Sequence, residues 1–357
     1  MRNRMFLIIT FILILLVSMT ACNDTSNPAK NKEEPKQIFD MAGREVQLPS
    51  KINSIYATHT IGSIFLYTLA PEKLAGWNEK IESADQFIAE EYRNLPILGR
   101  WQGTSSANIE ELLRVKPDLI INMGDINERY IEESDEITRL LGIPVVLLDG
   151  SIAKQAETYR FFGELLDCAD RATVLADYSE TVYKGVTENS KEIAHESKKR
   201  VYYGAGANGL ESIPSGSINL EVLELVAGEN VVKLTGNQDL RRVEVAIEEL
   251  LKWNPEVIIL SSKSSHNPEL LQEILADKRW AQIKAIKDGY IYEIPYGPLD
   301  WLSQPPTIMR YLGLQWLGNL LYPDTYQLSI RNRTAEFFEL FFGISLNEEE
   351  LTSLIGN

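Results

Sequence analysis

Two stretches of the chain share one pattern of apolar and polar positions. Residues 108–121 read NIEELLRVKPDLII, and residues 246–259 read AIEELLKWNPEVII. The first part of each predicts an amphipathic helix that ends near the proline. The continuous Leu, Ile and Val run that follows is typical of a parallel strand buried on both faces. Two copies so far apart in the chain predict two similar α/β lobes.

Further apolar runs along the chain predict additional strands and helices of the two lobes. Strands are expected at 52–57, 73–76, 144–148, 200–203 and 290–294, and helices at 61–69 and 218–226. Residues 169–195 carry Ala, Val and Tyr on one helical face and charges on the other, which predicts one long connecting helix. We therefore predict an α/β fold with two Rossmann-like lobes of mostly parallel sheet, 37–168 and 196–357, joined by this helix. A single helical connector favours small domain motions over wide hinge closure.

The first residues indicate export. Arg2 and Arg4 precede an apolar run at 5–17 that is too short to span a bilayer comfortably. Small residues then lead to Cys22, which looks like a lipoprotein signal over 1–21 with the thiol of Cys22 carrying lipid; an ordinary cleaved signal peptide is the alternative. The polar segment 22–36 is expected to be a flexible tether. These features predict an extracytoplasmic protein anchored to the cell membrane.

The charge and the Cys and His content of the chain limit the partners and metal sites that it can have. The formal charge of −16 argues against a nucleic-acid partner, because phosphate binding needs concentrated positive charge. If Cys22 carries lipid, Cys168 is the remaining thiol and cannot form an internal disulfide. The three histidines lack a metal-ligand partner at short spacing. We therefore expect no resident cofactor and no direct metal site, so that any metal would arrive inside a bound chelate.

Ligands of open α/β sheets bind outside the carboxyl ends of the strands, which nominates a cleft between the lobes. Arg100 and Trp101 are the leading candidates, because a guanidinium can bind oxyanions in a bidentate fashion and an indole offers a flat apolar face. The alternative is that Trp101 packs within its own lobe and Arg100 is solvated. The other candidates, each weighed against a core or surface role, are His59, Trp77, Arg241, Arg242, Tyr296 and Trp301.

Several segments carry a family resemblance in the same order along the chain. They are WQG at 101–103, NLEVLE at 219–224, DKRW at 277–280, and DW at 300–301 with PP at 305–306. They resemble the periplasmic-binding-protein domain of ABC importers for iron complexes, haem, vitamin B12 and molybdate, the class III solute-binding type. The resemblance implies a solute-binding lipoprotein, expected to be a monomer, that delivers its ligand to membrane permease subunits. A ferric siderophore-type chelate leads, with molybdate or tungstate, haem and a corrinoid as alternatives.

The resemblance also implies roles for single residues. Glu110 and Glu224 fall where the vitamin B12-binding relatives place acidic residues that form salt bridges with the membrane subunits, one in each lobe. The alternative is that both are solvent-facing helical glutamates. Where related chains often have an arginine before the two prolines, this chain has Gln304, which removes a charged donor from the expected binding loop.

Catalysis is the competing class of function. The sequence has no Gly-x-Ser-x-Gly elbow, zinc-protease helix or kinase signature. A carboxylate pair for glycoside hydrolysis is compatible with the many Asp and Glu residues, but no feature marks one. We therefore expect a binding protein and not an enzyme, with a lipid-anchored extracellular hydrolase as a remote alternative.

Overall fold

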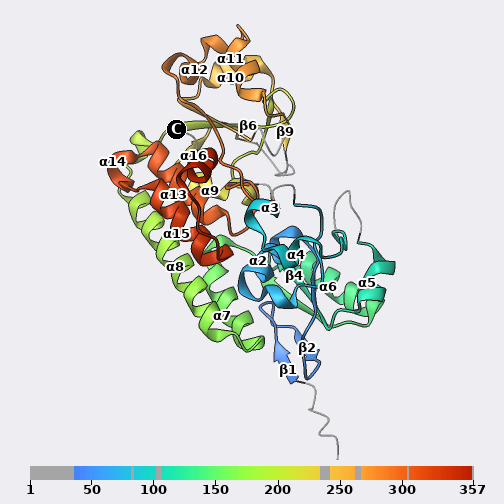
Figure 1. Ribbon diagram of the computed structural model, residues 1–357. Helices are drawn as coiled ribbons and strands as arrows, with labels where there is room; N and C mark the ends of the chain where they lie inside the picture. Colours follow the sequence, from blue (N-terminus) through green and yellow to red (C-terminus); the bar gives the residue numbers. More distant parts are fainter. Residues whose placement is uncertain are drawn as a thin grey trace, which may run out of the picture. The chain divides into compact units, whose positions relative to one another are not determined.

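The computed structural model describes residues 36–81, 84–101, 107–233, 242–261, 267–303 and 305–355. Its two main sheets are parallel throughout (Figure 1). The first has the order β3-β4-β5, and the second has the order β11-β10-β6-β8. Their strands are β3 (Ile55–Ala57), β4 (Leu119–Gly124), β5 (Val145–Asp149), β6 (Arg200–Gly204), β8 (Glu229–Asn230), β10 (Val257–Leu260) and β11 (Ile291–Glu293). The predicted α/β fold with two mostly parallel sheets is confirmed.

The sequence repeat is also a structural repeat. Helix α5 (Ile109–Val115) leads into β4, and helix α10 (Ile247–Trp253) leads into β10. Each helix ends at a residue in the left-handed conformation, Lys116 and Asn254, whose N–H donates to a carbonyl four residues back. A proline follows in both copies and prevents the helix from continuing.

Two predicted elements differ from the structure. Residues 73–76 form no strand, because Lys73 ends a 3₁₀ turn and the chain then contacts β3 through a single bridge between Leu74 and Ile55. Gly76 lies close to the backbone of residue 96, since a Cβ there would lie 2.4 Å from the carbonyl oxygen of Pro96. The helix expected over 218–226 is divided into a 3₁₀ turn and the short helix α9 (Glu221–Leu225).

The long helix between the sheets is α8 (Ala169–Lys191), within the predicted range 169–195. It packs against α7 (Gln155–Leu165), and Figure 1 shows the two helices side by side. Gly163 of α7 allows this close approach, because a Cβ there would lie 2.1 Å from the Cβ of Ala172. The smallest side chains therefore set the distance between these two helices.

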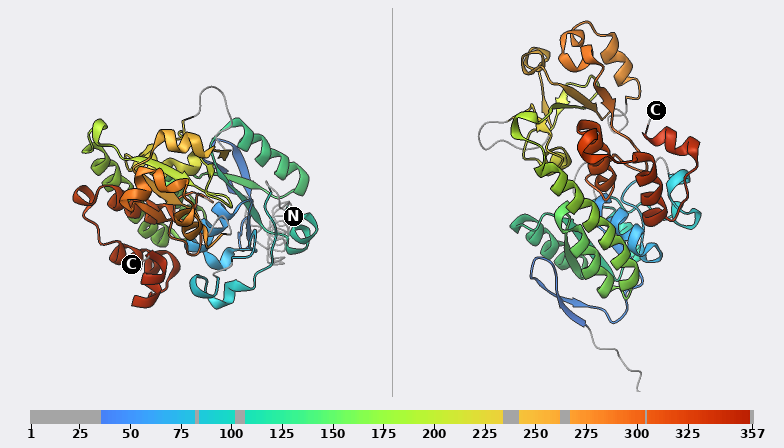
Figure 2. Two further views of the ribbon diagram at one scale, coloured as in Figure 1. Left: turned by 90° about the horizontal axis from the view of Figure 1, so that it is seen from above. Right: turned by 90° about the vertical axis from the view of Figure 1, so that its left-hand side faces the viewer.

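The C-terminal helices complete the core of the first half. They are α13 (Arg310–Leu321), α14 (Pro323–Tyr326), α15 (Ile330–Phe342) and α16 (Glu348–Ile355). In Figure 2, α13 and α15, in red, lie beside the green helix α8. Phe338 contacts Phe87, and Phe342 contacts Tyr67, with ring centroids 5.1 and 6.0 Å apart. Residues of α15, predicted as part of the lobe 196–357, thus pack on side chains of the lobe 37–168.

Six further helices and two antiparallel strand pairs belong to the described chain. The remaining helices are α2 (Thr60–Leu69), α3 (Ala84–Phe87), α4 (Glu90–Arg93), α6 (Glu128–Leu141), α11 (Leu270–Ala276) and α12 (Lys284–Asp288). Two pairs of strands are antiparallel: β1 (Lys36–Phe39) with β2 (Glu45–Leu48), which form a hairpin, and β7 (Glu211–Ser212) with β9 (Val243–Glu244).

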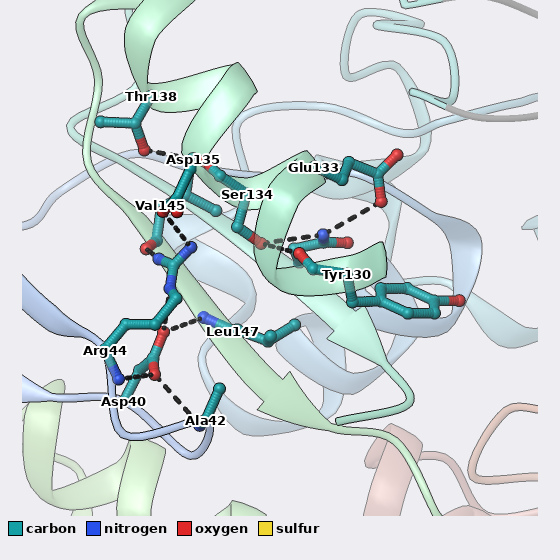
Figure 3. A network of polar contacts seen from close by, with 11 residues as sticks. Asp40, Ala42, Arg44, Tyr130, Glu133, Ser134, Asp135, Thr138, Val145 and Leu147 are labelled. Atoms are coloured by element: carbon teal, nitrogen blue, oxygen red, sulfur yellow. Dashed lines mark hydrogen bonds and ion pairs between the residues drawn. The ribbon is translucent and has the colours of Figure 1, made fainter. Parts of the chain in front are cut away.

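A buried polar network fixes the β1–β2 hairpin to the edge of the first sheet (Figure 3). The side chain of Asp40 accepts hydrogen bonds from its own turn, from Arg44 and from the N–H of Leu147 in β5, the last at 3.1 Å. Arg44 also donates to the carbonyl oxygen of Val145 at 2.6 Å and pairs with Asp135. Because an edge strand exposes unpaired backbone groups, these contacts give β5 partners on its open side.

Candidate functional site

The carboxyl end of β3 is held by side-chain hydrogen bonds. Thr58 follows the strand, is fully buried, and donates its hydroxyl to Asn122 Oδ1 at 2.7 Å. Asn122 in turn donates to Ser134 and Glu133 of α6. The next residue, His59, is the N-cap of α2, although its side chain makes no capping hydrogen bond. The position of His59 is therefore fixed by its neighbours in the sheet and the helix.

The imidazole of His59 is neutral at physiological pH. Burial, together with the positive charges of Arg100 and Arg129, lowers the pKa of His59 to about 4. Its Nε2 atom is buried and has no hydrogen-bond partner among the described residues. A neutral imidazole beside two guanidinium groups adds no charge, but it supplies one more polar atom for a ligand.

Arg100 and Trp101 are brought to the same place by the backbone. The carbonyl oxygen of Gly99 accepts hydrogen bonds from the hydroxyl of Tyr56 and the amide of Asn78, both at 2.9 Å. The N–H of Trp101 donates to the carbonyl oxygen of Thr58 at 2.9 Å. This pairing sets residues 99–101 alongside the end of β3. His59, Arg100 and Trp101, which the sequence nominated separately, are thereby brought together.

The two leading candidates have different surroundings. Trp101 is half-buried and packs against the apolar cluster that includes Leu98 and Leu112, so part of its indole belongs to its own lobe. Arg100 pairs with Glu79, with 3.2 Å between Nη2 and Oε2, and its Nε atom is buried with no acceptor among the residues described. Since a buried N–H without an acceptor is unfavourable, Arg100 retains capacity to bind an anionic group.

The second sheet carries a comparable group at the carboxyl end of β6. Arg242 pairs with Glu211 of β7, with 3.2 Å between Nη1 and Oε2. The hydroxyl of Tyr203 lies 3.0 Å from that of Ser303, and burial raises the pKa of Tyr203 to about 12. Tyr203 is therefore a neutral phenol at physiological pH, and Arg242 is the cation of this group.

Asp300 organises the loop that follows β11. Its carboxylate accepts hydrogen bonds from the hydroxyl of Ser261 at 3.0 Å and from the N–H groups of Leu302 and Ser303. Tyr296 and Asp300 are partners in an antiparallel bridge. Tyr296 also lines a cavity of about 340 Å³ that residues of α3 and α16 help to form. The candidate Tyr296 therefore sits at a solvent-accessible position.

Two predicted aromatic candidates are core residues in this structure. Trp77 is 3% exposed, and its indole N–H donates to the carbonyl oxygen of Tyr92 at 2.8 Å. Trp301 is fully buried, and its indole N–H donates to the carbonyl oxygen of Gly297 at 3.2 Å. Buried indoles with satisfied N–H groups stabilise the fold, so neither is part of the site that we propose below.

Three other predictions fall outside the described residues. They concern Arg241, Gln304 and the lipid attachment at Cys22. Among the residues that are described, His, Cys, Asp and Glu side chains do not gather in a group that could hold a metal ion. Within the same ranges, no helix is both long and apolar enough to cross a bilayer.

The two predicted docking glutamates are on exposed helix surfaces. Glu110 is in the first turn of α5, which Asn108 caps by accepting a hydrogen bond from the N–H of Glu111. Glu224 is in α9, and its carboxylate accepts a hydrogen bond from the N–H of Gly216 at 2.7 Å. Both are accessible to a partner protein.

Helix α9 is connected to the first sheet by a buried ion pair that the sequence did not suggest. Arg310 of α13 pairs with Glu221 of α9 and donates to the carbonyl oxygen of Gly150, just after β5, at 2.8 Å. The hydroxyl of Tyr311 donates to the carbonyl oxygen of Ile152 at 2.8 Å. Burial raises the pKa of Glu221, and the charge of Arg310 opposes that rise.

The residues that the sequence reasoning missed are mostly acidic partners. Glu79 follows the nominated Trp77, and Glu211 is far in sequence from Arg242. Glu79 follows a segment that was predicted as a strand, and Arg129 lies five residues after β4, so the search for strand ends could have found both. No local pattern announces Glu211 or Glu221, because their partners come from distant segments of the chain.

Comparison with known proteins gives a consistent result. A family model described as periplasmic binding protein matches residues 77–296. The molybdate-binding protein MolA of Haemophilus influenzae is 25% identical over 86% of this chain and 91% of its own length. The vitamin B12-binding protein of Salmonella typhimurium is 28% identical over 60% of this chain and 72% of its own.

A solved structure supports the same assignment. The ABC transporter solute-binding protein from Sulfurospirillum deleyianum is 28% identical, with a TM-score of 0.82 over 90% of this chain and 99% of the other. The fold is that of the class III solute-binding proteins, as the sequence predicted. The family match covers more than half of the chain, and the parallel sheets and connecting helix agree with it. This chain belongs to the periplasmic binding protein family of ABC-importer solute-binding proteins.

Proposed function

We propose that this protein is the extracytoplasmic receptor of an ABC importer and that its ligand is an anionic iron complex, a ferric siderophore-type chelate. The observation that carries the proposal is the placement of guanidinium groups at strand ends in both halves of the chain. The charges of Arg100 and Arg129 act on the neutral His59, and Arg242 pairs with Glu211, which follows β6. Cations near strand ends of both sheets favour a ligand that carries oxyanions on opposite sides.

The proposed binding residues are Arg100, Trp101, His59, Arg242 and Tyr296, with Arg241 as a further candidate. The half-buried indole of Trp101 would supply apolar contact to the organic part of a chelator. Metal would reach the protein inside that chelator, because the described residues supply no cluster of metal ligands. The ferric-citrate-binding protein YfmC of Bacillus subtilis, 20% identical over 82% of this chain, is a relative that supports an iron complex.

Molybdate or tungstate is the second candidate. The relative named for molybdate is similar over most of both chains, and a dianion of this kind suits paired guanidinium groups. Haem and corrinoids remain ligands to test, because relatives include a haem uptake protein and vitamin B12-binding proteins. All of these ligands belong to the same transport role.

We further propose that Cys22 carries lipid and that Glu110 and Glu224 contact the permease. A relative from Bacillus subtilis is named as a putative substrate-binding lipoprotein, which supports the anchor. The exposure of both glutamates supports the docking role. Individual exposed ion pairs contribute about 0.2–1 kcal/mol, so the pair would orient the complex more than it strengthens it.

A ligand panel tests the proposal. Purified protein is titrated with ferric citrate, a ferric catecholate chelate, molybdate, haemin and cyanocobalamin, and binding is followed by calorimetry and thermal stabilisation. We expect saturable one-to-one binding of a ferric chelate and a rise in apparent stability, since the ligand binds the native state. Binding of molybdate instead would favour the second candidate. Turnover of any compound, or binding of none, would contradict the receptor role.

A further inference from the structure

One arginine from each half of the proposed ligand site pairs with a glutamate in the same way. Arg100 Nη2 lies 3.2 Å from Glu79 Oε2, and Arg242 Nη1 lies 3.2 Å from Glu211 Oε2. In both pairs one terminal nitrogen meets one carboxylate oxygen. The two arginines lie in loops of different halves of the chain and come from unrelated local sequences. The two guanidinium groups that we propose to bind the ligand, those of Arg100 and Arg242, therefore each have a carboxylate partner in this structure.

Each carboxylate is fixed by its own surroundings. Glu79 Oε1 accepts a hydrogen bond at 2.6 Å from the hydroxyl of Thr60, the buried first residue of α2. The carboxyl group of Glu211 lies against Gly206, where a Cβ would come within 2.5 Å of Oε1. Gly206 also has a φ of +75°, which favours glycine. These contacts keep both glutamates beside their arginines.

Both pairs are weak enough to be replaced. The side chains of Arg100 and Glu79 are 32% and 38% exposed, and those of Arg242 and Glu211 are 27% and 40% exposed. Their separations exceed the 2.7–2.9 Å or so that is typical of strong charge-assisted bonds. Pairs of this kind contribute about 0.2–1 kcal/mol. The Arg310–Glu221 pair differs, because the side chain of Arg310 is 2% exposed.

We propose that Glu79 and Glu211 are specificity-determining counterions that occupy Arg100 and Arg242 until an anionic ligand displaces them. This inference rests on the proposed function. The ligand class it implies is a polyvalent oxyanion, such as a chelate with several ionised oxygens or a tetrahedral metal oxyanion. A monovalent anion gains about as much from each guanidinium as the resident carboxylate does, so it has little advantage in the exchange. A polyvalent anion contacts both arginines and gains from each.

The test compares Glu79→Gln, Glu211→Gln and the double variant with wild-type protein. Glutamine keeps the size of the side chain and removes its charge. Titration calorimetry with ferric citrate and with sodium molybdate measures the affinity of each protein. Glu157→Gln is the matched control, because Glu157 is an exposed residue of α7 that pairs with Lys154 at 2.7 Å and changes the net charge equally.

We expect each single variant to bind the probe about 2- to 5-fold more tightly, because the ligand no longer has to break one exposed ion pair. The double variant should show about the product of the two effects, and Glu157→Gln should match wild type. Unchanged or weaker binding in both single variants would overturn the inference and leave the receptor function standing. If wild-type protein binds neither these probes nor any of the panel, the proposed function fails and this inference fails with it.

A second measurement needs no ligand. Arginine modification by p-hydroxyphenylglyoxal, mapped by mass spectrometry, reports how accessible each guanidinium is to an exchanging partner. Arg100 should react faster in Glu79→Gln than in wild type, and Arg242 should react faster in Glu211→Gln. Equal rates would show that the glutamates do not hold the arginines in solution, which would also overturn the inference.

Discussion

Replacing Arg310 by methionine should destabilise this protein by several kilocalories per mole. The guanidinium pairs with Glu221 and donates to the carbonyl oxygens of Gly150 and Thr307, at 2.8 and 3.2 Å. Methionine has a similar length and removes all of these contacts. It leaves the carboxylate of Glu221, whose side chain is 25% exposed, without its cation.

The magnitude follows from the cost of an uncompensated charge. Removing one partner of a buried ion pair costs about 3–5 kcal/mol. For domains of 150–250 residues each kilocalorie lowers Tm by about 2–4 °C, so Tm should fall by roughly 6–20 °C. In the double variant Arg310→Met/Glu221→Leu no charge remains unpaired. Its loss should be only about 1–2 kcal/mol, mainly from the hydrogen bonds to the two carbonyl oxygens.

Thermal and urea denaturation of the wild type, the two single variants and the double variant form a double-mutant cycle. We expect a coupling free energy of at least about 1 kcal/mol between Arg310 and Glu221. If Arg310→Met lost less than about 1 kcal/mol, or if the double variant lost the sum of both single effects, the buried pair would not act as described. Because Glu221 begins α9, which also carries Glu224, uptake by the double variant would show whether the pair positions the docking helix.

Three further predictions concern separate parts of the chain. Gly163→Val should lower the free energy of unfolding by about 1–3 kcal/mol or more, measured by urea denaturation, because a side chain there meets Ala172 of α8. His59 is neutral when folded, with a pKa of about 4 against about 6.5 unfolded, so the unfolded state binds the proton first and stability falls as the pH drops from about 6.5 to 4. In His59→Asn the pH dependence of stability over this interval should be smaller by up to about 1.4 kcal/mol per pH unit; identical profiles would contradict the assignment. Glu110→Arg combined with Glu224→Arg should leave ligand affinity unchanged and abolish uptake in cells; normal uptake would refute the docking role.

The two parallel sheets and the connecting helix could be predicted because they depend on local patterns. The repeated IEELL segment, its proline and its apolar strand specify a helix–strand unit wherever they occur, and both copies formed one. Strand ends also carried useful information, since His59, Arg100 and Trp101 were nominated from them and lie together.

Burial and pairing over long distances could not be predicted in the same way. The indoles of Trp77 and Trp301 belong to an apolar cluster that also contains residues of α13 and α15, far away in the sequence, and that packing has no local signal. Likewise, Glu211 precedes Arg242 by more than thirty residues, and the antiparallel pair of β7 and β9 brings them together. Pairs of this kind depend on tertiary structure, so a single sequence does not reveal them.

The most direct measurement of the central claim is the affinity of Arg100→Gln for the ligand that the panel identifies. Loss of a charged hydrogen bond is worth about 1.5–3 kcal/mol, so binding should weaken by about 10- to 150-fold while the melting temperature of the unliganded variant stays close to that of wild type. Equal affinity in Arg100→Gln and wild type would show that the ligand binds elsewhere, and the account of an arginine-based receptor site would be contradicted.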